Sequence, residues 1–501
     1  MNFIKFLVTW ARRLPWSFTI SLVVALLAWL VLVATVLTYF DVSTISEAIL
    51  KMLSNFDFKK TGAIGYILKP VPVFFEGIVI IAILFLGVLG SYNFAGWVSR
   101  LLYKSPKVYV HDPIAPVAGS GRILAEFTKA RGIEDLRIGI ICAGGGAKGA
   151  YQAGSLKAIY EFLQENSSLN KVRMIAGTSI GSWNSMFWMA GLIKPPGPGQ
   201  MSAHETWWKQ IRADRIIAFA AYAPMTKNYF LLTTPWQEAF KTLFISNDSV
   251  KKNLMDRLYE NPNDSLHFYL TRSNVESGTL EFATNNVNLP GMMRRNWKTG
   301  EEQPFFPSKH YELIVPSNGG DALEDMRTAV FASMDLPPLF PYVFINQEWF
   351  EDGGVVDNLP VRFATQIENC NLIFILPLNA SFEAPVDQKS VIKRLGRVME
   401  VRQGVLERES MKLTHLYNDL AKLKNPQKPE LVSVFAICPQ QPLAINTSEF
   451  WKTKEAGQAF DLMYVATRHE LQDKFLAATD PHALRMALVS PLGEITYKED
   501  F

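Results

Sequence analysis

Cysteine is scarce in this chain, and its scarcity excludes one class of fold. The 501 residues include three cysteines, Cys142, Cys370 and Cys438, and each lies in or beside an apolar run typical of a strand. A free thiol in such a run usually behaves as a small buried hydrophobe. Three thiols do not build a disulfide framework, so we expect the main folded part of the chain to lie in a reducing compartment.

An excess of charge of one sign is also missing. The chain has 50 Lys and Arg residues against 47 Asp and Glu residues, a formal net charge of +3, and no long basic run. Proteins that attract nucleic acids concentrate basic residues on one face or in one segment. We therefore expect no nucleic-acid partner.

Charged residues are absent from residues 16–40, WSFTISLVVALLAWLVLVATVLTYF. At a rise of about 1.5 Å per residue, a helix of this length crosses a hydrocarbon core of about 30 Å. A secretory signal would instead have a shorter apolar region and a small-residue cleavage site, and neither is evident. The run predicts a transmembrane helix.

A second apolar stretch, at about residues 71–92, has roughly the minimum length for a span but contains Pro72 and Glu76 near its start. We expect a second transmembrane helix there, with a re-entrant or interfacial helix as the alternative. Two crossings form an N-terminal helical hairpin and leave the N-terminus and the larger C-terminal part on the same side. Basic residues outside the hairpin slightly outnumber those in its loop, which predicts an integral membrane protein whose larger part faces the cytoplasm.

After a polar connector at 104–135, the chain alternates strand and helix patterns. Residues 136–163 indicate a strand, a glycine-rich turn and a helix, and residues 171–192 repeat that order. Two successive βα units imply an α/β fold with a mostly parallel sheet and helices on its faces. Later strands are expected at 267–275, 279–285, 371–378 and 431–439, and amphipathic helices at 387–425 and 450–475.

A G-x-S-x-G pattern centred on Ser179 follows the second of these strands and precedes its helix. Gly177 and Gly181 allow the backbone to turn sharply and leave the serine Oγ exposed at the start of the helix, as in a nucleophile elbow. The alternative is an ordinary strand-to-helix turn in which Thr178 or Ser179 caps the helix. Further motifs are needed to choose between the two.

The glycine-rich turn after the first strand, GGGAKG at 144–149, matches the dinucleotide fingerprint G-x-G-x-x-G. That fingerprint expects an acidic residue at the end of the second strand, but the strand here ends in Ala-Gly-Thr. A phosphate-binding Walker loop needs Gly-Lys-Ser/Thr, and Lys148 is followed by Gly149. The remaining interpretation is a loop of free backbone N–H groups that stabilises the negative oxygen formed when a serine attacks an ester.

Asp352 begins an Asp-Gly-Gly sequence, which in isolation favours a hairpin turn. A nucleophilic serine needs a base, however, and no histidine lies in a recognisable motif. The seven histidines are His111, His204, His267, His310, His415, His469 and His482. A carboxylate on a glycine turn can accept the serine proton if desolvation and orientation raise its basicity, so the combination indicates a Ser179–Asp352 dyad.

Three motifs together resemble the patatin-like phospholipases, in particular bacterial-type members with N-terminal transmembrane segments. GGGAKGAYQAGSL resembles the family's oxyanion loop and first helix, GTSIGSWNS its serine elbow, and DGGVVDNLP its aspartate turn. The segment FASMDLPPLFPYVFINQEWFEDGG resembles the A-S-x-x-x-P segment that leads into the aspartate. The resemblance covers about residues 136–378.

The resemblance implies a patatin-like three-layer α/β/α sandwich with Ser179 as nucleophile and Asp352 as its proton acceptor. It places the oxyanion hole at Gly144, Gly145 and Gly146. Other matching motif positions are Lys148, Gly149, Gly177, Gly181, Gly353 and Gly354. Two positions depart from the family pattern, because Lys148 stands where arginine is usual and Asp335 where a small apolar residue is common.

The resemblance also implies calcium-independent cleavage of acyl esters in phospholipids or neutral lipids, with no cofactor and no metal. We therefore expect a phospholipase A or lysophospholipase type of enzyme that acts on membrane lipids. The alternatives are a lipid transacylase with the same dyad and a non-catalytic lipid-binding scaffold on a hydrolase fold. The motifs do not specify the head group, the acyl position, the protein partners or the oligomeric state.

The expected organisation has four parts. Residues 1–103 form the membrane anchor, 104–135 the connector, 136–380 the catalytic domain and 381–501 a C-terminal helical extension packed on it. A cap-like insertion is expected at about 201–260, where large apolar side chains are dense. Some of these side chains pack in the core and others suit a cap or a bilayer-facing surface.

Overall fold

The computed structural model describes most of the chain after residue 121 and two short helices before it. The described ranges are 20–29, 86–98, 122–197, 199–219, 229–260, 265–296, 298–316, 321–337, 339–379, 391–424, 431–440, 445, 447, 449–477, 485–490 and 492–498. These residues divide into two compact units. The smaller comprises Met1–Ser105, Asp214–Trp236 and Pro338–Phe340, and the larger comprises Pro106–Ala213, Gln237–Pro337 and Pro341–Phe501.

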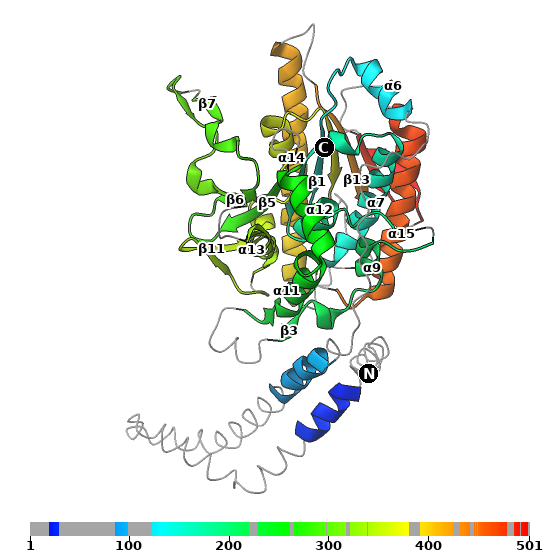
Figure 1. The fold of residues 1–501 in the computed structure, drawn as a ribbon, viewed down its shortest axis with the longest axis vertical. Coiled ribbons are helices and arrows are strands. Elements are labelled where there is room, and N and C mark those ends of the chain that lie inside the picture. The colour runs from blue at the N-terminus through cyan, green and yellow to red at the C-terminus, as the bar shows by residue number, and fades with distance from the viewer. Residues whose placement is uncertain are drawn as a thin grey trace, which may run out of the picture. The chain divides into compact units, whose positions relative to one another are not determined.

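An 11-stranded sheet forms the centre of the larger unit (Figure 1). Its order is β10-β11-β5-β2-β1-β12-β13-β14-β15, with β6 paired to β5 and β9 paired to β6. The strands are β1 (Ile138–Cys142), β2 (Val172–Thr178), β5 (His267–Asn274), β6 (Leu280–Thr284), β9 (Tyr311–Leu313), β10 (Val343–Ile345), β11 (Glu348–Asp352), β12 (Leu372–Leu376), β13 (Ser433–Pro439), β14 (Arg485–Val489) and β15 (Ile495–Lys498). Every ladder from β5 across to β14 is parallel.

The central strands are apolar because both of their faces are covered. β1, β12 and β13 are buried at every position, as expected for parallel strands between two layers of helices. The four later strands expected from the sequence are confirmed as β5, β6, β12 and β13. Short β7 (Met293–Arg295) and β8 (Glu302–Pro304) form a separate hairpin.

Helices lie on both faces of the sheet, as an α/β/α arrangement requires. On one face α8 packs on β1 and β2, and α7 and α15 pack with it. On the other face, the core joins side chains of β1, β2, β12 and β13 to η8 and to Met411 of α14. After residue 121, the described helices of eight or more residues are α6 (Arg122–Arg131), α7 (Gly149–Glu165), α8 (Ile180–Met189), α12 (Asp248–Tyr259), α13 (Ala322–Met334), α14 (Val391–Lys424) and α15 (Thr453–His469). Shorter ones include α9 (Ala203–Lys209), α11 (Thr234–Phe240) and the π-helical η8 (Phe363–Ile367).

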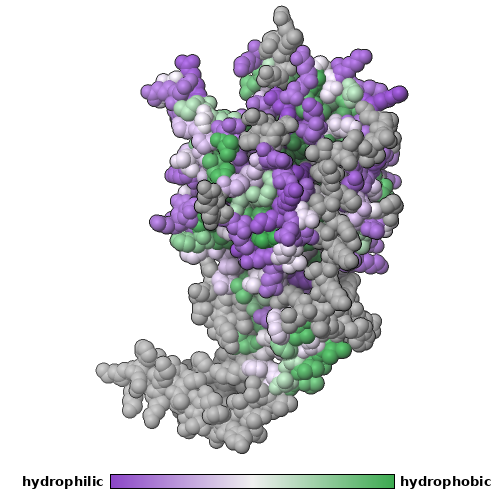
Figure 2. All heavy atoms as spheres, in the orientation of Figure 1, coloured by the Kyte–Doolittle hydropathy of each residue, from purple (hydrophilic) through white to green (hydrophobic). Residues whose placement is uncertain are grey.

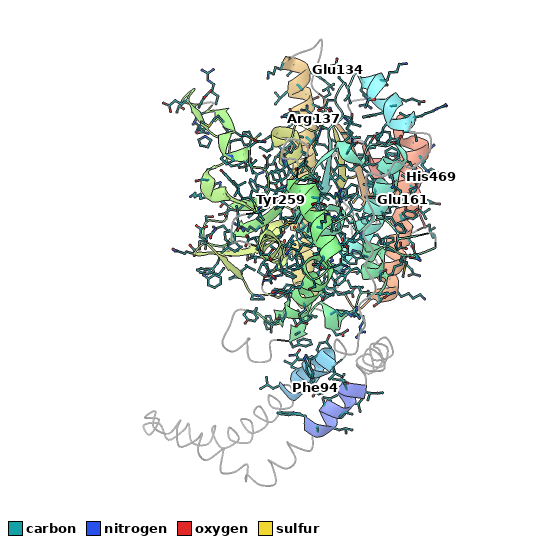
Figure 3. The ribbon with its side chains drawn as sticks, viewed as in Figure 1. Phe94, Glu134, Arg137, Glu161, Tyr259 and His469 are labelled. Atoms are coloured by element: carbon teal, nitrogen blue, oxygen red, sulfur yellow. The ribbon has the colours of Figure 1, made fainter. Side chains whose placement is uncertain are left out.

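Polar contacts tie α7 to α15. Figure 3 marks Glu161 on α7 and His469 at the end of α15, and these two helices run side by side. Glu161 Oε2 accepts a hydrogen bond from the Tyr464 hydroxyl at 2.7 Å, and Arg468 donates two to Glu165 at 2.8 and 3.0 Å. The amphipathic helix expected at 450–475 is therefore confirmed, and it anchors the C-terminal part of the chain on the first βα unit.

The C-terminal part differs from the helical extension expected at 381–501. β13, β14 and β15 lie within it and continue the central sheet, so the sheet does not end near residue 380. β13 is recognisable in the sequence as an apolar run, but β14 and β15 are short. β14 pairs with β13, which is distant in sequence, and β15 pairs antiparallel with β14 at the edge of the sheet. The expected boundary at 380 therefore cuts through the sheet.

The smaller unit contains a hydrogen-bonded link between two distant segments. Its described parts include helices at 20–29 and 86–98 and a two-stranded ladder of β3 (Ala218–Phe219) and β4 (Leu231–Leu232). The Asn93 side chain donates to the Phe219 carbonyl at 2.6 Å and accepts from the Phe219 amide at 2.8 Å, and the ring of Phe219 packs edge-on against Tyr92. Part of the cap-like insertion expected at 201–260 therefore packs on the 86–98 helix.

Most of the two expected transmembrane segments, 16–40 and 71–92, lies outside the described residues. The parts that are described, 20–29 and 86–92, are helical and mainly apolar, and Figure 2 shows hydrophobic residues over the described helices of this unit. Within the described ranges, no helix combines the length and the apolar character that a membrane crossing requires.

Candidate active site

Ser179 occupies a strained turn between β2 and α8. β2 ends at Thr178, α8 begins at Ile180, and Ser179 between them has φ 53° and ψ −126°. A residue with a side chain rarely adopts a positive φ, so the surrounding structure must hold this one in place. The same turn raises a serine Oγ above the end of a strand in a nucleophile elbow.

Close packing requires the two glycines of the G-x-S-x-G pattern. A Cβ on Gly177 would lie 2.6 Å from the backbone N and Cα of Ser182. A Cβ on Gly181 would lie 2.1 Å from the carbonyl oxygen of Cys142. Both distances are too short for any side chain, so the pattern has a steric cause in this fold.

Gly181→Ala should therefore destabilise the protein strongly. The added methyl group meets backbone atoms of β1, which cannot rotate away, and we expect a loss of about 3 kcal/mol in the free energy of unfolding. Chemical denaturation would measure the loss. Gly291→Ala is the matched control, because its Cβ would meet no heavy atom within 4 Å. Equal stabilities of the two variants would contradict the packing described here.

A serine at the end of α13 binds the turn at Ser179. The Ser179 amide donates a hydrogen bond to Ser333 Oγ at 2.9 Å, and Ser182 Oγ lies 2.8 Å from the same oxygen. Ser333 is the serine of the A-S-x-x-x-P segment. That segment therefore contributes a side chain that fixes the strained turn.

Strand register brings Asp352 beside Ser179. β2 pairs with β5 as far as Thr178, which lies opposite Thr271. β11 then pairs with the same edge of β5, with Asp352 opposite Arg272, while β6 occupies the other edge. Asp352 and the end of β2 therefore lie next to each other along one edge of β5. The Ser179 side chain is close enough to the Asp352 carboxyl to lower its pKa.

Burial controls the basicity of Asp352. The residue is 1% exposed. This burial raises the pKa of its carboxyl to about 7. The Ser179 side chain and the Gly354 amide, which donates to Oδ1 at 2.8 Å, have the opposite effect and lower the pKa. A carboxylate with a pKa near neutrality is a stronger base than an ordinary aspartate, and at least about half of it is ionised at pH 7 and above.

The glycine turn after β1 approaches the same point. A Cβ on Gly144 would lie 2.9 Å from Ser179 Cβ, so a side chain there would collide with the elbow. Gly146 has φ 57°, and its Cβ would lie 2.1 Å from the Thr447 carbonyl oxygen. The structure therefore brings together Ser179, Asp352 and the turn that contains Gly144.

The amides of this turn are not equivalent. Gly144 N–H already donates to Asn358 Oδ1 at 3.1 Å, and Ala147 N–H donates to the Thr447 carbonyl at 2.8 Å. The N–H groups of Gly145 and Gly146 make no hydrogen bond to another residue that the structure describes. These two amides are the donors that remain for an oxyanion.

The remaining motif glycines line the same loops. A Cβ on Gly149 would lie 2.5 Å from Ile180 Cγ1, and one on Gly353 would lie 2.4 Å from Thr271 Oγ1. A Cβ on Gly354 would lie 2.7 Å from Asn358 Oδ1. Glycine at these positions lets the three loops approach one another.

A buried polar network behind the glycine turn was not predicted from the sequence. Asn358 donates to the Gly144 carbonyl and accepts from its amide, and it also donates to Glu407 Oε1 on α14. Glu407 is 1% exposed and accepts from the Asn379 side chain at 2.9 Å and from its amide at 3.2 Å. Burial raises the pKa of the Glu407 carboxyl to about 7, and the hydrogen bonds from the two asparagines oppose that rise.

Lys148 belongs to this network and is not exposed. It is 5% exposed, donates to Asn379 Oδ1 at 3.0 Å and forms an ion pair with Glu400 of α14 at 3.0 Å. A single ammonium group meets both acceptors without the fork of an arginine. The departure from the family pattern at this position is therefore compatible with a structural role.

Glu407→Gln should weaken both folding and turnover. All the neighbours of this carboxylate are donors, so a glutamine would turn an NH2 group toward one of them, at a cost of about 1–3 kcal/mol. Displacement of Asn358 would shift the Gly144 turn, and we expect kcat to fall about tenfold or more with a smaller change in KM. Thermal unfolding and steady-state kinetics would measure the two effects. Asp419→Asn on the exposed side of α14 is the control, and an E407Q variant that matches it would contradict a positioning role.

Asp335, the second departure from the family pattern, lies beside the dyad. Its carbonyl oxygen accepts a hydrogen bond from the Asp352 amide at 3.2 Å. Its side chain is 1% exposed, and Oδ1 has no hydrogen-bond partner among the described residues. Burial, and next the nearby charge of Asp352, raise the pKa of the Asp335 carboxyl well above its ordinary value.

Two of the described histidines, His204 and His267, have other partners. His204 is fully buried, stacks on Phe187 and lies 2.9 Å from Asn184 Oδ1, and burial lowers its pKa to about 3. His267 Nδ1 lies 2.7 Å from Glu368 Oε1. Within the described part of the chain, no histidine hydrogen-bonds to Ser179.

Comparison with known proteins finds a family model that matches part of the chain. No curated protein matches the sequence. A crystal structure of VipD from Legionella pneumophila is similar at 13% sequence identity and a TM-score of 0.31, covering 74% of this chain and 72% of that one, a likeness too low to carry an argument. Residues 140–365, which hold Ser179, Asp352 and the glycine turn, match the family model of the patatin-like phospholipases.

Proposed function

We propose that this chain is a membrane-anchored serine lipid acyl hydrolase of the phospholipase A or lysophospholipase type. The observation that carries the proposal is the placement of the Ser179 side chain against the buried Asp352 carboxyl, whose pKa it lowers. Both lie beside a glycine turn in which the Gly145 and Gly146 amides make no hydrogen bond to another described residue. The patatin-like domain at 140–365 supports lipid esters as the substrate class.

In the first step Ser179 Oγ attacks the ester carbonyl carbon while Asp352 accepts the hydroxyl proton. The carbonyl oxygen becomes negative and accepts hydrogen bonds from the Gly145 and Gly146 amides. The intermediate then collapses, the C–O bond to the alcohol breaks, and the departing alkoxide takes the proton from Asp352. The products are a lipid alcohol and an acyl group esterified to Ser179.

In the second step water attacks the acyl-enzyme. Asp352 accepts a proton from the water, the same amides hold the oxyanion, and Ser179 Oγ leaves with the proton as the fatty acid is released. None of these steps uses a calcium ion, so we propose a calcium-independent reaction.

Membrane attachment through residues 16–40 is part of the proposal. The uncharged run would hold the site near its substrates and so raise their effective concentration. The proposed partners are thus the bilayer and its lipids, with the larger part of the chain on the cytoplasmic side. Release of the protein from isolated membranes by alkaline carbonate, without detergent, would exclude a spanning anchor.

The function is tested with the purified full chain and vesicles of mixed phosphatidylcholine and phosphatidylethanolamine. We expect release of free fatty acid and lysophospholipid, measured by mass spectrometry, at an unchanged rate in the presence of a calcium chelator. Appearance of the acyl group on an added lipid alcohol, with little free fatty acid, would show the transacylase instead. Absence of both products would indicate the non-catalytic scaffold and overturn the proposal.

A further inference from the structure

The outer face of α14 is apolar although it faces solvent. α14 has 34 residues, and its inner face packs on the larger unit through buried side chains such as Gln403, Glu407 and Met411 (Figure 1). The outer face carries seven apolar side chains that are 40–78% exposed, namely Val398, Val401, Val405, Leu413, Leu416, Leu420 and Leu423. An exposed apolar face of this extent usually marks an interaction surface.

The apolar face has a symmetric spacing. Six of its side chains form one row with Glu409 and Lys412, at positions 398, 401, 405, 409, 412, 416, 420 and 423. The steps along the row are 3, 4, 4, 3, 4, 4 and 3, the same in both directions. Their average lies close to the 3.5–3.6 residues that keep one side of a helix facing a partner helix.

A row that is the same in both directions matches a second copy of itself running the opposite way. With a two-fold axis between residues 410 and 411, the row brings each valine of one copy opposite a leucine of the other. The facing pairs are Val398 with Leu423, Val401 with Leu420, Val405 with Leu416 and Glu409 with Lys412, and each pair occurs twice. We propose that this face of α14 binds a second copy of this chain, α14 against α14 in antiparallel orientation.

The charges at the middle of the row select this partner. The Glu409 and Lys412 side chains are 59% and 45% exposed and lie 2.9 Å apart within one copy. In the antiparallel pair, Glu409 of each copy meets Lys412 of the other, so the two charges at the centre are compensated. In a parallel pair Glu409 would face Glu409 and Lys412 would face Lys412, which is repulsive.

The same charges argue against a lipid surface as the occupant. A helix that lies in a bilayer interface presents an uninterrupted apolar face and keeps its charges on the opposite side. Here the charged pair sits in the middle of the apolar row. Isologous contact across a two-fold axis is also the commonest way in which soluble chains associate.

A charge exchange tests the pairing with matched variants. In Glu409→Lys both central positions are basic, and in Lys412→Glu both are acidic, so each variant alone places like charges opposite each other. The equimolar mixture of the two variants restores opposite charges at both positions, and so does the double variant E409K/K412E. Both substituted positions are exposed, and equal melting temperatures would show that folding is unchanged.

The readout is the mass of the full chain in a mild detergent, measured by sedimentation over a range of concentrations. For the wild type we expect twice the chain mass of 56.4 kDa. For each single variant we expect a dissociation constant at least about tenfold larger. The mixture and the double variant should recover the dissociation constant of the wild type. A monomeric wild type, or single variants as dimeric as the wild type, would overturn the proposal. A monomer that binds vesicles of anionic phospholipid, and loses that binding in Leu416→Glu, would identify a lipid surface as the occupant instead.

Cross-linking tests the register. The three natural cysteines are buried and do not interfere. A mixture of Val405→Cys and Leu416→Cys copies should form an intermolecular disulfide on mild oxidation, whereas a mixture of Val405→Cys and Leu423→Cys copies should not. Equal cross-linking in the two mixtures would contradict the antiparallel pairing.

Discussion

Ser179→Ala should reduce the release of fatty acid by at least about a thousandfold. Without the hydroxyl, no acyl-enzyme forms, and neither Asp352 nor the two free amides provides an alternative nucleophile. The substitution removes a single oxygen and leaves the Ser179 amide bonded to Ser333 Oγ, so the variant should fold normally. Lipid turnover per molecule, measured with protein of verified melting temperature, gives the result.

Ser179→Gly separates activity from stability. The backbone at this position has φ 53°, which glycine adopts without the strain of about 1–3 kcal/mol that a side chain incurs. We expect an inactive protein that melts at a temperature at or above that of the wild type. A lower melting temperature would show that the turn is not strained in the way described.

Asp352→Asn should lower turnover by a similarly large factor, about a hundredfold or more. The amide has the same shape and still accepts the hydrogen bond from Gly354, but it does not take the proton of Ser179. The loss should appear in kcat more than in KM, because the lipid still binds. Steady-state kinetics on the same vesicles measures both constants, and turnover close to that of the wild type would exclude Asp352 as the base.

The pH dependence of the wild type supports the same assignment. Because the pKa of Asp352 is raised to about 7, kcat/KM should fall about tenfold per unit below pH 7 and level off above it. The raised pKa also means that the native state holds a proton which the unfolded state releases, so this carboxyl destabilises the fold as pH rises from about 4 to about 7. Asp352→Asn should therefore be more stable than the wild type at pH 8, and a less stable variant would contradict the burial of an ionisable group there.

The site was predictable to the extent that it rests on local sequence. Glycine on both sides of Ser179 and after Asp352 marks turns in which a side chain would collide with neighbouring backbone, and the structure shows those collisions at Gly177, Gly181 and Gly353. The apolar runs that became β1, β2, β5 and β12 were equally visible. Patterns of this kind depend on residues a few positions apart.

The rest depended on contacts between distant segments. Asn358 was visible within the aspartate motif, but its bond to Glu407 spans 49 positions and links two loops to a helix whose sequence shows only charge and helical period. The Thr447 carbonyl oxygen lies against Gly146, although the two residues are 301 positions apart. No spacing rule connects such residues, because the sheet order that brings them together is set by the packing of the whole domain.

The two faces of α14 have different roles. Its inner face holds Glu407 against Asn358 and so fixes the glycine turn, and its outer face presents the symmetric apolar row. Both roles follow from one amphipathic helix with buried polar groups on one side. The charge-exchange variants alter only the outer face, and Glu407→Gln alters only the inner one.

The most direct measurement of the central claim is the site and rate of labelling by a fluorophosphonate. Such a reagent forms a covalent bond to an activated serine Oγ with loss of fluoride, and peptide mass spectrometry locates it. We expect one label per chain on the peptide that contains Ser179, loss of lipid hydrolysis in proportion to labelling, and labelling slowed about a hundredfold or more in Asp352→Asn. Label on another residue, or full hydrolysis by a chain labelled at Ser179, would contradict the account.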